Sequence, residues 1–378
     1  MRSKGWKKVN WGSIATLEYG KSLRDYENGN GTVPVFGTNG QIGFTNKPLC
    51  SFPSVIVGRK GAYRGIHFCD RPFFVIDTVF YLKPKSDEIN LKFAYYQLLT
   101  QDINGMDSGS AIPSTSRDDF YNLEVNLPPL ETQTRIASIL SALDEKIELN
   151  RQTNATLEAI AQAIFKEWFV DFRFPGATGK MQESELGPIP KGWRIGKLSE
   201  VCKNTRKTIH PKDVYSNTAY VGLEHIPRKS LGLASWGASG DVDSQKTYFK
   251  QFNVLFGKLR PYFHKVCIAP FDGICSTDIL VIESHQMQYF SFALLHLFSN
   301  EMITFVSSVA DGTRMPRVDW QSIGNYEIIL PPEQLISEFH EVVFPFFIDI
   351  IENNQHANSL ATLRGNLLPK LMSGEMEV

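Results

Sequence analysis

Basic side chains gather in two short segments of similar composition. Arg59-Lys60-Gly-Ala-Tyr-Arg64 lies in the first part of the chain, and Lys258-Leu-Arg260-Pro-Tyr-Phe-His-Lys265 lies in the second. Arginine and lysine beside glycine, serine and threonine suit contacts with phosphate groups, and arginine can also donate two hydrogen bonds to guanine. Any single residue of this kind is often an ordinary surface charge. Basic residues at matched positions in two segments favour a shared role in binding nucleic acid.

Polar residues near two turns extend this candidate surface. Arg117 follows Ile112-Pro113, and Arg314 and Arg317 flank Met315-Pro316. Asn39 or Gln41, at the Asn39-Gly40 turn, could recognise adenine, because an amide side chain can bind that base through two hydrogen bonds. The candidate DNA-binding residues are Thr38, Asn39, Gln41, Arg59, Lys60, Arg64, Arg117, Lys258, Arg260, Lys265, Arg314 and Arg317.

The chain is an internal repeat with an offset that changes along its length. Asn150, Leu157 and Trp168 correspond to Asn353, Leu360 and Leu371, an offset of 203 residues. The offset falls to 199 between Val55–Arg59 and Val254–Lys258, and to 187 between Gly5-Trp6 and Gly192-Trp193. An ordered change of offset indicates two copies of one module with loop insertions. Residues shared by both copies are expected to bind phosphate or maintain the fold, because base-contacting residues must differ between recognised sequences.

No catalytic site is expected. Gly176-Ala-Thr-Gly-Lys180 resembles a phosphate-binding loop, but it has two residues between its glycines and Met181 after the lysine, so ATP binding is not expected. Both Leu-Pro-Pro sequences lack the polar and aromatic neighbours of an amino-methyltransferase motif and are interpreted as helix starts. The eight histidines show no spacing suited to a metal or a catalytic triad. No cofactor is therefore predicted for this chain.

Composition favours an intracellular protein of two or three domains. The chain has 378 residues, of which 42% are hydrophobic and 21% are charged. Met1–Lys8 is polar and basic, so a signal peptide is not expected, and no apolar run is long enough to span a membrane. The five cysteines are odd in number and lack CxxC spacing, so they are expected to be reduced thiols in the cytoplasm.

Charge is distributed unevenly along the chain, although the net charge is −1. Residues 1–130 contain 15 Lys+Arg and 12 Asp+Glu, and residues 193–332 contain the same numbers, a balance of +3 in each copy. Residues 131–170 and 333–378 have balances of −2 and −5. Phosphate binding needs local positive charge and not a high overall pI, so the two +3 regions are the candidates.

Each copy begins with a mixed, mostly β domain. Short β-branched and aromatic segments bounded by turns predict strands, and two apolar segments, Lys92–Leu99 and Phe290–Phe298, predict helices. The predicted strands begin at Val33, Ser54, Thr78, Asn253 and Asp278.

Each copy ends in a long helix. Glu131–Phe169 has no proline or glycine, and apolar residues recur at spacings of four and three, as in a coiled coil. At about 1.5 Å per residue the helix would be roughly 58 Å long. Pro345 is expected to kink or break the first turns of the second helix, and Leu363 is expected to replace Arg364 at one apolar position.

Asn150 and Asn353 occupy equivalent positions in these apolar stripes and are expected to fix the interhelical register. The simplest arrangement is an antiparallel pair of helices within one chain. In the alternative arrangement each helix caps its own domain.

These features predict an α+β fold in which two mixed, mostly β domains are joined by two long antiparallel coiled-coil helices. The predicted segments are 1–130 and 193–332 for the domains, 131–170 and 333–378 for the spacer helices, and 171–192 for a Gly- and Pro-rich linker.

The chain resembles the specificity subunits of type I restriction–modification systems. The resemblance rests on Glu185-Leu-Gly-Pro-Ile-Pro-Lys-Gly-Trp193, Val33–Gly43, Phe256-Gly-Lys-Leu-Arg-Pro-Tyr262 and the Leu-Pro-Pro element before each long helix. It implies that each domain recognises one half of a split site in double-stranded DNA. It also implies docking of two methyltransferase subunits, which bind S-adenosylmethionine, and of restriction–translocase subunits. The chain itself would then be non-catalytic.

Two other functions remain open from the sequence. The chain could be the recognition subunit of a related system with a fused nuclease–methyltransferase, or a coiled-coil scaffold that binds proteins. A steep fall of DNA affinity with salt would exclude the scaffold. A stand-alone methyltransferase is disfavoured because cofactor and catalytic motifs are missing.

Overall fold

A computed structural model describes residues 5–27, 29, 31–106 and 112–378. Half of Met1–Lys8, on which the expectation of no signal peptide rests, lies outside the described residues. The chain forms two compact units. The first comprises Met1–Lys146 and Leu360–Val378, and the second comprises Ile147–Ser359. The boundary therefore falls inside both long helices, whereas the predicted segments place it at the helix ends. Those predicted domain limits stay a prediction.

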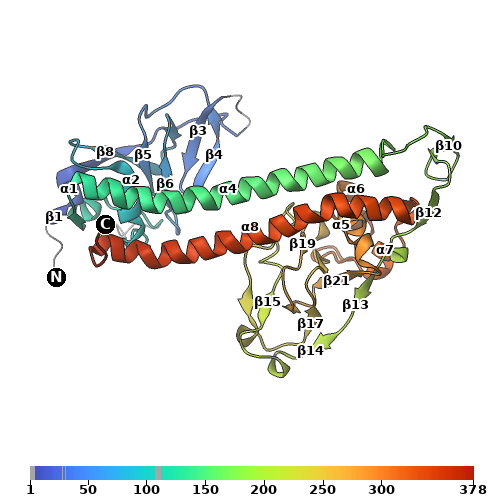
Figure 1. Ribbon diagram of the computed structural model, residues 1–378. Coiled ribbons are helices and arrows are strands. Elements are labelled where there is room, and N and C mark those ends of the chain that lie inside the picture. The colour runs from blue at the N-terminus through green and yellow to red at the C-terminus, as the bar shows by residue number, and fades with distance from the viewer. Residues whose placement is uncertain (1–4, 28, 30, 107–111) are drawn as a thin grey trace. The chain divides into compact units, whose positions relative to one another are not determined.

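The first unit contains a four-stranded antiparallel sheet whose central strand, β5, is entirely buried. Helix α2 packs on β5 and β6 (Figure 1). Its first turn is capped by Asn90, whose side chain accepts hydrogen bonds from the N–H groups of Lys92 and Phe93. In spatial order the strands are β2 (Ala15–Tyr19), β8 (Val79–Pro84), β5 (Ser54–Gly58) and β6 (Ile66–Cys69), and α2 spans Leu91–Leu99.

A smaller sheet and a strand pair complete the first globular domain, by which we mean the part of the first unit outside the long helices. The sheet has the order β4-β3-β7, and β3 pairs with β7 in parallel. These elements are β3 (Val33–Gly37), β4 (Gly40–Thr45), β7 (Phe74–Val75), the pair β1 (Lys7–Asn10) and β9 (Glu124–Leu127), and helices α1 (Trp11–Ile14) and α3 (Arg117–Asn122).

The second unit repeats this architecture. Its four-stranded sheet has the order β13-β21-β18-β19, which corresponds strand by strand to β2-β8-β5-β6. Helix α5, apolar on nearly every face, is buried as that composition requires. The sheet strands are β13 (Cys202–Thr205), β21 (Ile279–Ser284), β18 (Val254–Gly257) and β19 (Val266–Ile268), and the helices are α5 (Phe290–Phe298), α6 (Asn300–Val309) and α7 (Trp320–Gly324).

An insertion distinguishes the second globular domain, which is the part of the second unit outside the long helices. Its smaller sheet has the order β14-β17-β20-β15-β16, so two strands are added beyond the parallel pair shared with the first domain. This insertion accounts for part of the change of offset. The elements are β14 (Thr208–Ile209), β15 (Ala219–Val221), β16 (Gly237–Ala238), β17 (Lys246–Phe249) and β20 (Gly273–Cys275), with the pair β12 (Arg194–Lys197) and β22 (Glu327–Leu330).

Both long helices begin directly after Leu-Pro-Pro, as predicted. Helix α4 spans Leu130–Phe169 and α8 spans Glu333–Ser373. In the first unit, residues of α4 and Leu371 of α8 join the core of the globular domain. In the second unit, Phe165 and Phe169 of α4 pack with Phe339 of α8. The helices thus pack on each other, and the first turns of each also cover its own domain, so both predicted arrangements contribute.

Two features of α8 differ from expectation. Pro345 does not break the helix, which continues to Ser373, whereas a kink at this residue stays a prediction. Proline costs about 3 kcal/mol in a helix interior, and burial of Phe339, Val343 and Phe347 nearby offsets this, at roughly 1.5–3 kcal/mol each. Leu363 does not enter the contact either, because 46% of it is exposed. Arg364 stays in the contact and pairs with Asp144 of α4 at 2.5 Å.

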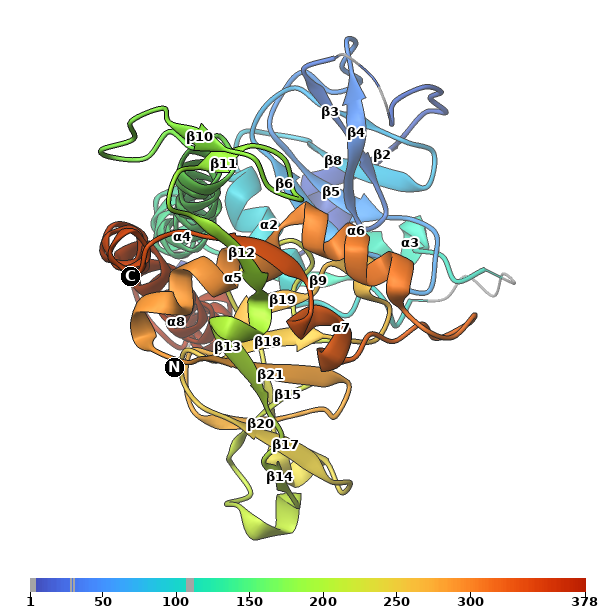
Figure 2. The same cartoon turned by 90° about the vertical axis from the view of Figure 1, so that its right-hand side faces the viewer.

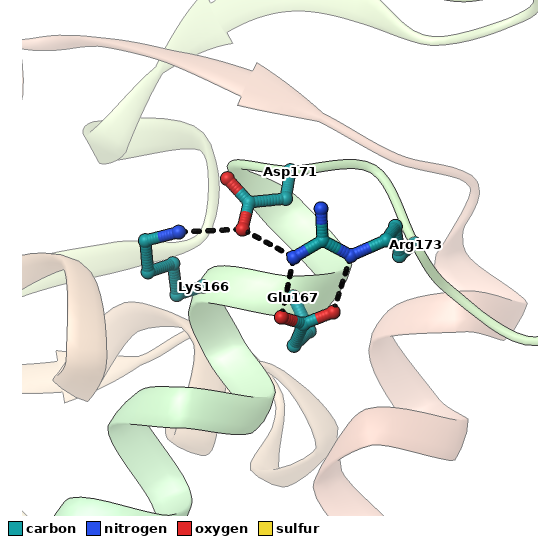
Figure 3. A network of polar contacts seen from close by, with 4 residues as sticks. All are labelled: Lys166, Glu167, Asp171 and Arg173. Atoms are coloured by element: carbon teal, nitrogen blue, oxygen red, sulfur yellow. Dashed lines mark hydrogen bonds and ion pairs between the residues drawn. The ribbon is translucent and has the colours of Figure 1, made fainter.

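The predicted linker 171–192 contains a small hairpin, β10 (Met181–Gln182) with β11 (Ile189–Pro190). The first residues of the linker are joined to the end of α4 by an ion-pair network (Figure 3). Arg173 contacts Glu167 at 2.5 Å and Asp171 at 2.8 Å, and Lys166 also contacts Asp171. These exposed cations lower the pKa of both carboxyl groups. The network links the first residues after α4 to its last turn.

Within the described residues no single helix is long and apolar enough to cross a membrane; one bent pair, Met287–Phe298 with Asn300–Val309, meets the length and composition criteria.

Candidate nucleic-acid interface

A hydrogen-bonded backbone frame surrounds the end of β5 in the first domain. Gly58 N–H donates to the carbonyl of Gly65 at 2.8 Å, and Arg59 N–H donates to that of Thr78 at 2.9 Å. The Arg59 carbonyl in turn accepts from Thr115 N–H at 2.8 Å. Three distant segments are thus fixed around Arg59.

The second domain builds the same frame around the end of β18. Gly257 N–H donates to the Lys265 carbonyl at 2.8 Å, Lys258 N–H donates to the Asp278 carbonyl at 3.0 Å, and Val318 N–H donates to the Lys258 carbonyl at 3.1 Å. Arg59 and Lys258 therefore occupy equivalent positions, as the sequence predicts.

The frame also aligns Arg64 with a residue of the second domain. Because Gly65 and Lys265 have the same role, Arg64 corresponds to His264. Arg64 is only 1% exposed, and its guanidinium donates to four backbone carbonyls. These belong to Gly61, Ile103, Asn104 and Met106, at 2.7–3.1 Å. Arg64 is thus committed to the fold, which argues against a direct contact of its guanidinium with DNA.

A tyrosine joins two of the predicted arginines in the first domain. The guanidinium carbons of Arg59 and Arg117 lie 4.9 and 5.1 Å from the ring centre of Tyr19, at cation–π distance. Arg59 also donates to the Asp77 carbonyl at 2.9 Å, and Arg117 donates to the Tyr121 hydroxyl at 2.8 Å. Tyr19 is 48% exposed. Both guanidinium groups are therefore held in place beside an accessible aromatic ring.

The predicted turn residues lie against the same loop. Thr38 Oγ1 donates to the carbonyls of Lys60 and Thr78 at 3.1 and 3.3 Å. Asn39 and Gln41, at the tip of the β3–β4 hairpin, are exposed, as is Lys60. The structure thus brings the hairpin tip and the basic loop together.

A groove of about 590 Å³ marks the corresponding place in the second domain. Lys258 and Arg317 line it, and Arg317 is paired with Asp278 at 3.1 Å. Arg206 and Trp320, which sequence reasoning missed, line it as well. Helix α7, which begins at Trp320, lies beside β13 (Figure 2). Hydroxyl and amide groups complete the polar wall: Asn204, Thr205, Thr208, Thr247, Thr277 and Ser322.

The remaining candidates of the second domain differ in accessibility. Arg260 and Arg314 are exposed, and the Arg260 guanidinium lies 3.5 Å from the Arg314 carbonyl. Lys265 is partly buried, and its ammonium group donates to the Leu223 carbonyl. Burial, followed by the charge of Arg228, lowers the pKa of Lys265. Lys265 is therefore committed to the fold more than to a ligand.

Each domain thus carries partly exposed basic residues on a hydrogen-bonded frame of the same plan. The sequence model of the family described as "Type I restriction modification DNA specificity domain" matches residues 3–159 and 190–357. The two matches cover most of the chain and coincide with its two copies. The chain belongs to this family.

Curated relatives in the type I specificity family match nearly the whole chain. The MjaIX specificity subunit of Methanocaldococcus jannaschii is 26% identical over 97% of this chain and 88% of the relative. The EcoDI specificity subunit of Escherichia coli is 26% identical over 98% and 88%. The crystal structure of the S subunit from M. genitalium has a TM-score of 0.65, with 18% identity over 98% of this chain and 97% of that one. The last comparison supports the fold alone.

The two asparagines predicted to meet in this member of the type I specificity family do so within the second unit. Asn150 Nδ2 donates to the Asn353 carbonyl at 3.3 Å, and Asn353 Nδ2 donates to Asn154 Oδ1 at 2.9 Å. Asn154 also reaches Asn354 and the Ile350 carbonyl, at 3.2 and 3.3 Å. The contact is antiparallel; its role in fixing the register stays a prediction.

A signal for the missed residues was present in the sequence. Applying the offset of 187, found at the start of the repeat, to Tyr19 leads to Arg206, and applying 203 to Arg117 leads to Trp320. The similarity of the basic segments does not reveal these positions, because each aligns a basic residue with an aromatic one. Among the described residues no cluster of three or more His, Cys, Asp or Glu could hold a metal ion.

Proposed function

We propose that this chain is the DNA-recognition subunit of a type I restriction–modification complex. Each globular domain recognises one half of a bipartite site. The observation that carries this proposal is the basic frame around Arg59, built a second time around Lys258 with the same backbone hydrogen bonds. Two equivalent surfaces suit a target of two parts, and the partly exposed Arg59 and Lys258, with exposed Lys60 and Arg260 near them in sequence, suit phosphate contact.

The partners follow from the same repeat. Two equivalent halves offer two docking positions, so we propose two methyltransferase subunits, each binding S-adenosylmethionine, together with restriction–translocase subunits. The chain itself contributes recognition of the DNA target and no catalysis. Membership in the type I specificity family supports this assignment, and curated relatives carry the name of specificity subunits.

Sequencing of methylated adenines in a host with and without this chain tests the proposal. We expect methylation of a split sequence that appears only when the chain and its methyltransferase partner are both present. Methylation that is independent of the chain would contradict it. Binding of the purified chain to DNA should also fall steeply with log salt, because several phosphates are neutralised. A salt-independent interaction with protein partners alone would instead favour the scaffold function.

The long helices are proposed to set the length of the unrecognised spacer. Removing seven residues from each helix, on α8 beyond Ile351 so that the core of the second domain is retained, should change the spacer and leave both half-sites unchanged. A changed half-site with an unchanged spacer would contradict this role.

A further inference from the structure

At two positions beside the frame, an arginine and an aromatic residue exchange places between the two domains. The first is at the end of the outer strand of the main sheet. Tyr19, the last residue of β2, lies opposite Phe80 of β8. Extending the register of β13 by one residue puts Arg206 opposite Leu280 of β21. Phe80 and Leu280 correspond because each pairs with the residue before the glycine that ends β5 or β18. Tyr19 and Arg206 therefore occupy the same place.

The second position is the start of the short helix after the Ile/Met-Pro pair. Arg117 begins α3, whose N-cap is Ser116, and Trp320 begins α7, whose N-cap is Asp319. Each cap side chain accepts a hydrogen bond from the N–H three residues later. Arg117 and Trp320 thus occupy the same place as well.

The residue one turn later differs in a way that matches this exchange. Arg117 donates to the hydroxyl of Tyr121, four residues on. The residue four positions after Trp320 is Gly324, where an added Cβ would lie only 3.1 Å from the indole ring. The glycine therefore gives the indole room that a larger residue would remove.

In the first domain the strand thus supplies the aromatic ring and the helix supplies the cation, whereas in the second domain the strand supplies the cation and the helix supplies the ring. The frame between them is unchanged, and its own basic residue is Arg59 in one copy and Lys258 in the other. Phosphate is the same at every step of DNA, so a residue that binds it has no reason to change. Bases differ between half-sites, and the chemistry that recognises them must differ too.

We propose that the exchanged pairs, Tyr19 with Arg117 and Arg206 with Trp320, recognise bases, whereas Arg59 and Lys258 bind phosphate. The inference rests on the proposed function and assigns roles within it. Arg117 and Arg206 donate to a guanine edge in the major groove, and the adjoining ring packs against the neighbouring base, such as the methyl group of thymine. The hydrogen bond to Tyr121 and the ring of Tyr19 hold the Arg117 guanidinium before DNA arrives, which lowers the entropic cost of binding.

The second domain provides the sharper test, because Arg206 is exposed and its substitution leaves the core intact. The full chain with its methyltransferase partner is offered a randomised DNA duplex at several salt concentrations. Arg206→Lys keeps the charge but replaces the rigid planar guanidinium, which matches the two acceptors of guanine, with a flexible ammonium group of poorer fit. We expect it to lose about 10- to 100-fold of the preference at one base pair of one half-site, with the salt dependence unchanged.

Lys258→Ala should act differently. It should weaken binding to all sequences alike and reduce the salt slope by about one, as loss of a single phosphate contact does. Lys203→Ala serves as the charge-matched control, because Lys203 is an exposed residue of the same strand region and is paired with Glu283 at 3.4 Å. It should change neither property.

The outcomes distinguish failure of the proposed function from failure of the residue assignments. If wild-type complex selects no split sequence, the proposed function fails. If wild-type complex selects one and Arg206→Lys retains the full preference, the assignment of Arg206 to a base is overturned and the proposed function stands. Arg117→Lys gives the same test in the other half-site, with Lys83→Ala, an exposed residue at the opposite end of β8, as its control.

Discussion

The two domains hold equivalent loops in place with different chemistry. In the first, Arg64 is buried and bonds four carbonyls. In the second, the equivalent residue is His264, also buried, whose Nε2–H donates to the Phe298 carbonyl at 2.9 Å. Burial lowers the pKa of His264. Arginine keeps its proton throughout the accessible pH range and histidine does not. Duplication has thus preserved a backbone plan while its stability came to depend on different ionisable groups.

Substituting Arg64 should give the largest effect in this comparison. Arg64→Ala leaves four carbonyls without their donor, two of them in buried hydrogen bonds, and opens a cavity, so the first unit should lose about 3–5 kcal/mol of stability. Exposed Arg71→Ala, in the same domain, should have almost no effect. Hydrogen exchange in each unit measures both. A loss limited to that of Arg71→Ala would show that the carbonyls find water instead.

The stabilities of the two units should respond differently to low pH. In the second, burial lowers the pKa of His264, His296 and His340, that of His296 to about 3, whereas the first unit has one histidine, His67, whose pKa burial also lowers. A lowered folded pKa gives stability that is present above the unfolded value of 6.5 and is lost as pH falls towards the folded value. The second unit should therefore weaken first.

His296→Leu tests this pH dependence directly. The ring packs between Phe165 and Phe292, and its Nε2 has no hydrogen-bond partner among the described residues, so an apolar side chain fits the site. At pH 5 the variant should retain about 2 kcal/mol that wild-type loses, relative to pH 7. Urea unfolding at both pH values, followed by hydrogen exchange, provides the measurement. Equal pH dependence of the two proteins would contradict the role of His296.

The interhelical contacts should differ in their response to salt. In the first unit the contacts between α4 and α8 include the Asp144–Arg364 ion pair, whose side chains are 24% and 36% exposed. In the second they include the uncharged Asn154–Asn353 hydrogen bond. Arg364→Ala and Asn353→Ala should each cost about 1 kcal/mol at low salt. At 1 M salt the cost of the first should shrink and that of the second should persist. A parallel decline of both would remove this distinction.

The exposed network at the end of α4 should give the smallest effect. Arg173→Ala removes two contacts that solvent screens, so the thermal unfolding of the second unit should not change measurably. A clear decrease would show that the direction of the chain after α4 contributes to the stability of the unit.

The sequence predicted elements whose cause is local and missed contacts whose cause is distant. Strands such as Ser54–Gly58 and the starts of both long helices follow from adjacent residues, and the structure places them within about one residue of the prediction. The burial of Arg64 depends on carbonyls about 40 residues away, which no local pattern reveals. The predicted break at Pro345 considers only the local effect of proline on one turn. Aromatic residues packed along several turns stabilise the helix. The exchanged pairs were not predicted, because each equivalent position holds an arginine in one domain and an aromatic residue in the other.

The hydrophobic core of the first unit is complete only after the last turns of α8 have been synthesised. Leu371 and Met372 belong to the core that also contains Trp11 and Phe93, whereas the second unit is built from one continuous stretch, Ile147–Ser359. During synthesis at about 5–20 residues per second, the first unit would wait on the order of ten to fifty seconds after Lys146 is made. The second unit can complete its core during that interval. The half of the chain that is translated first is therefore expected to mature last, and a product truncated before Leu360 would leave the core of the first unit open.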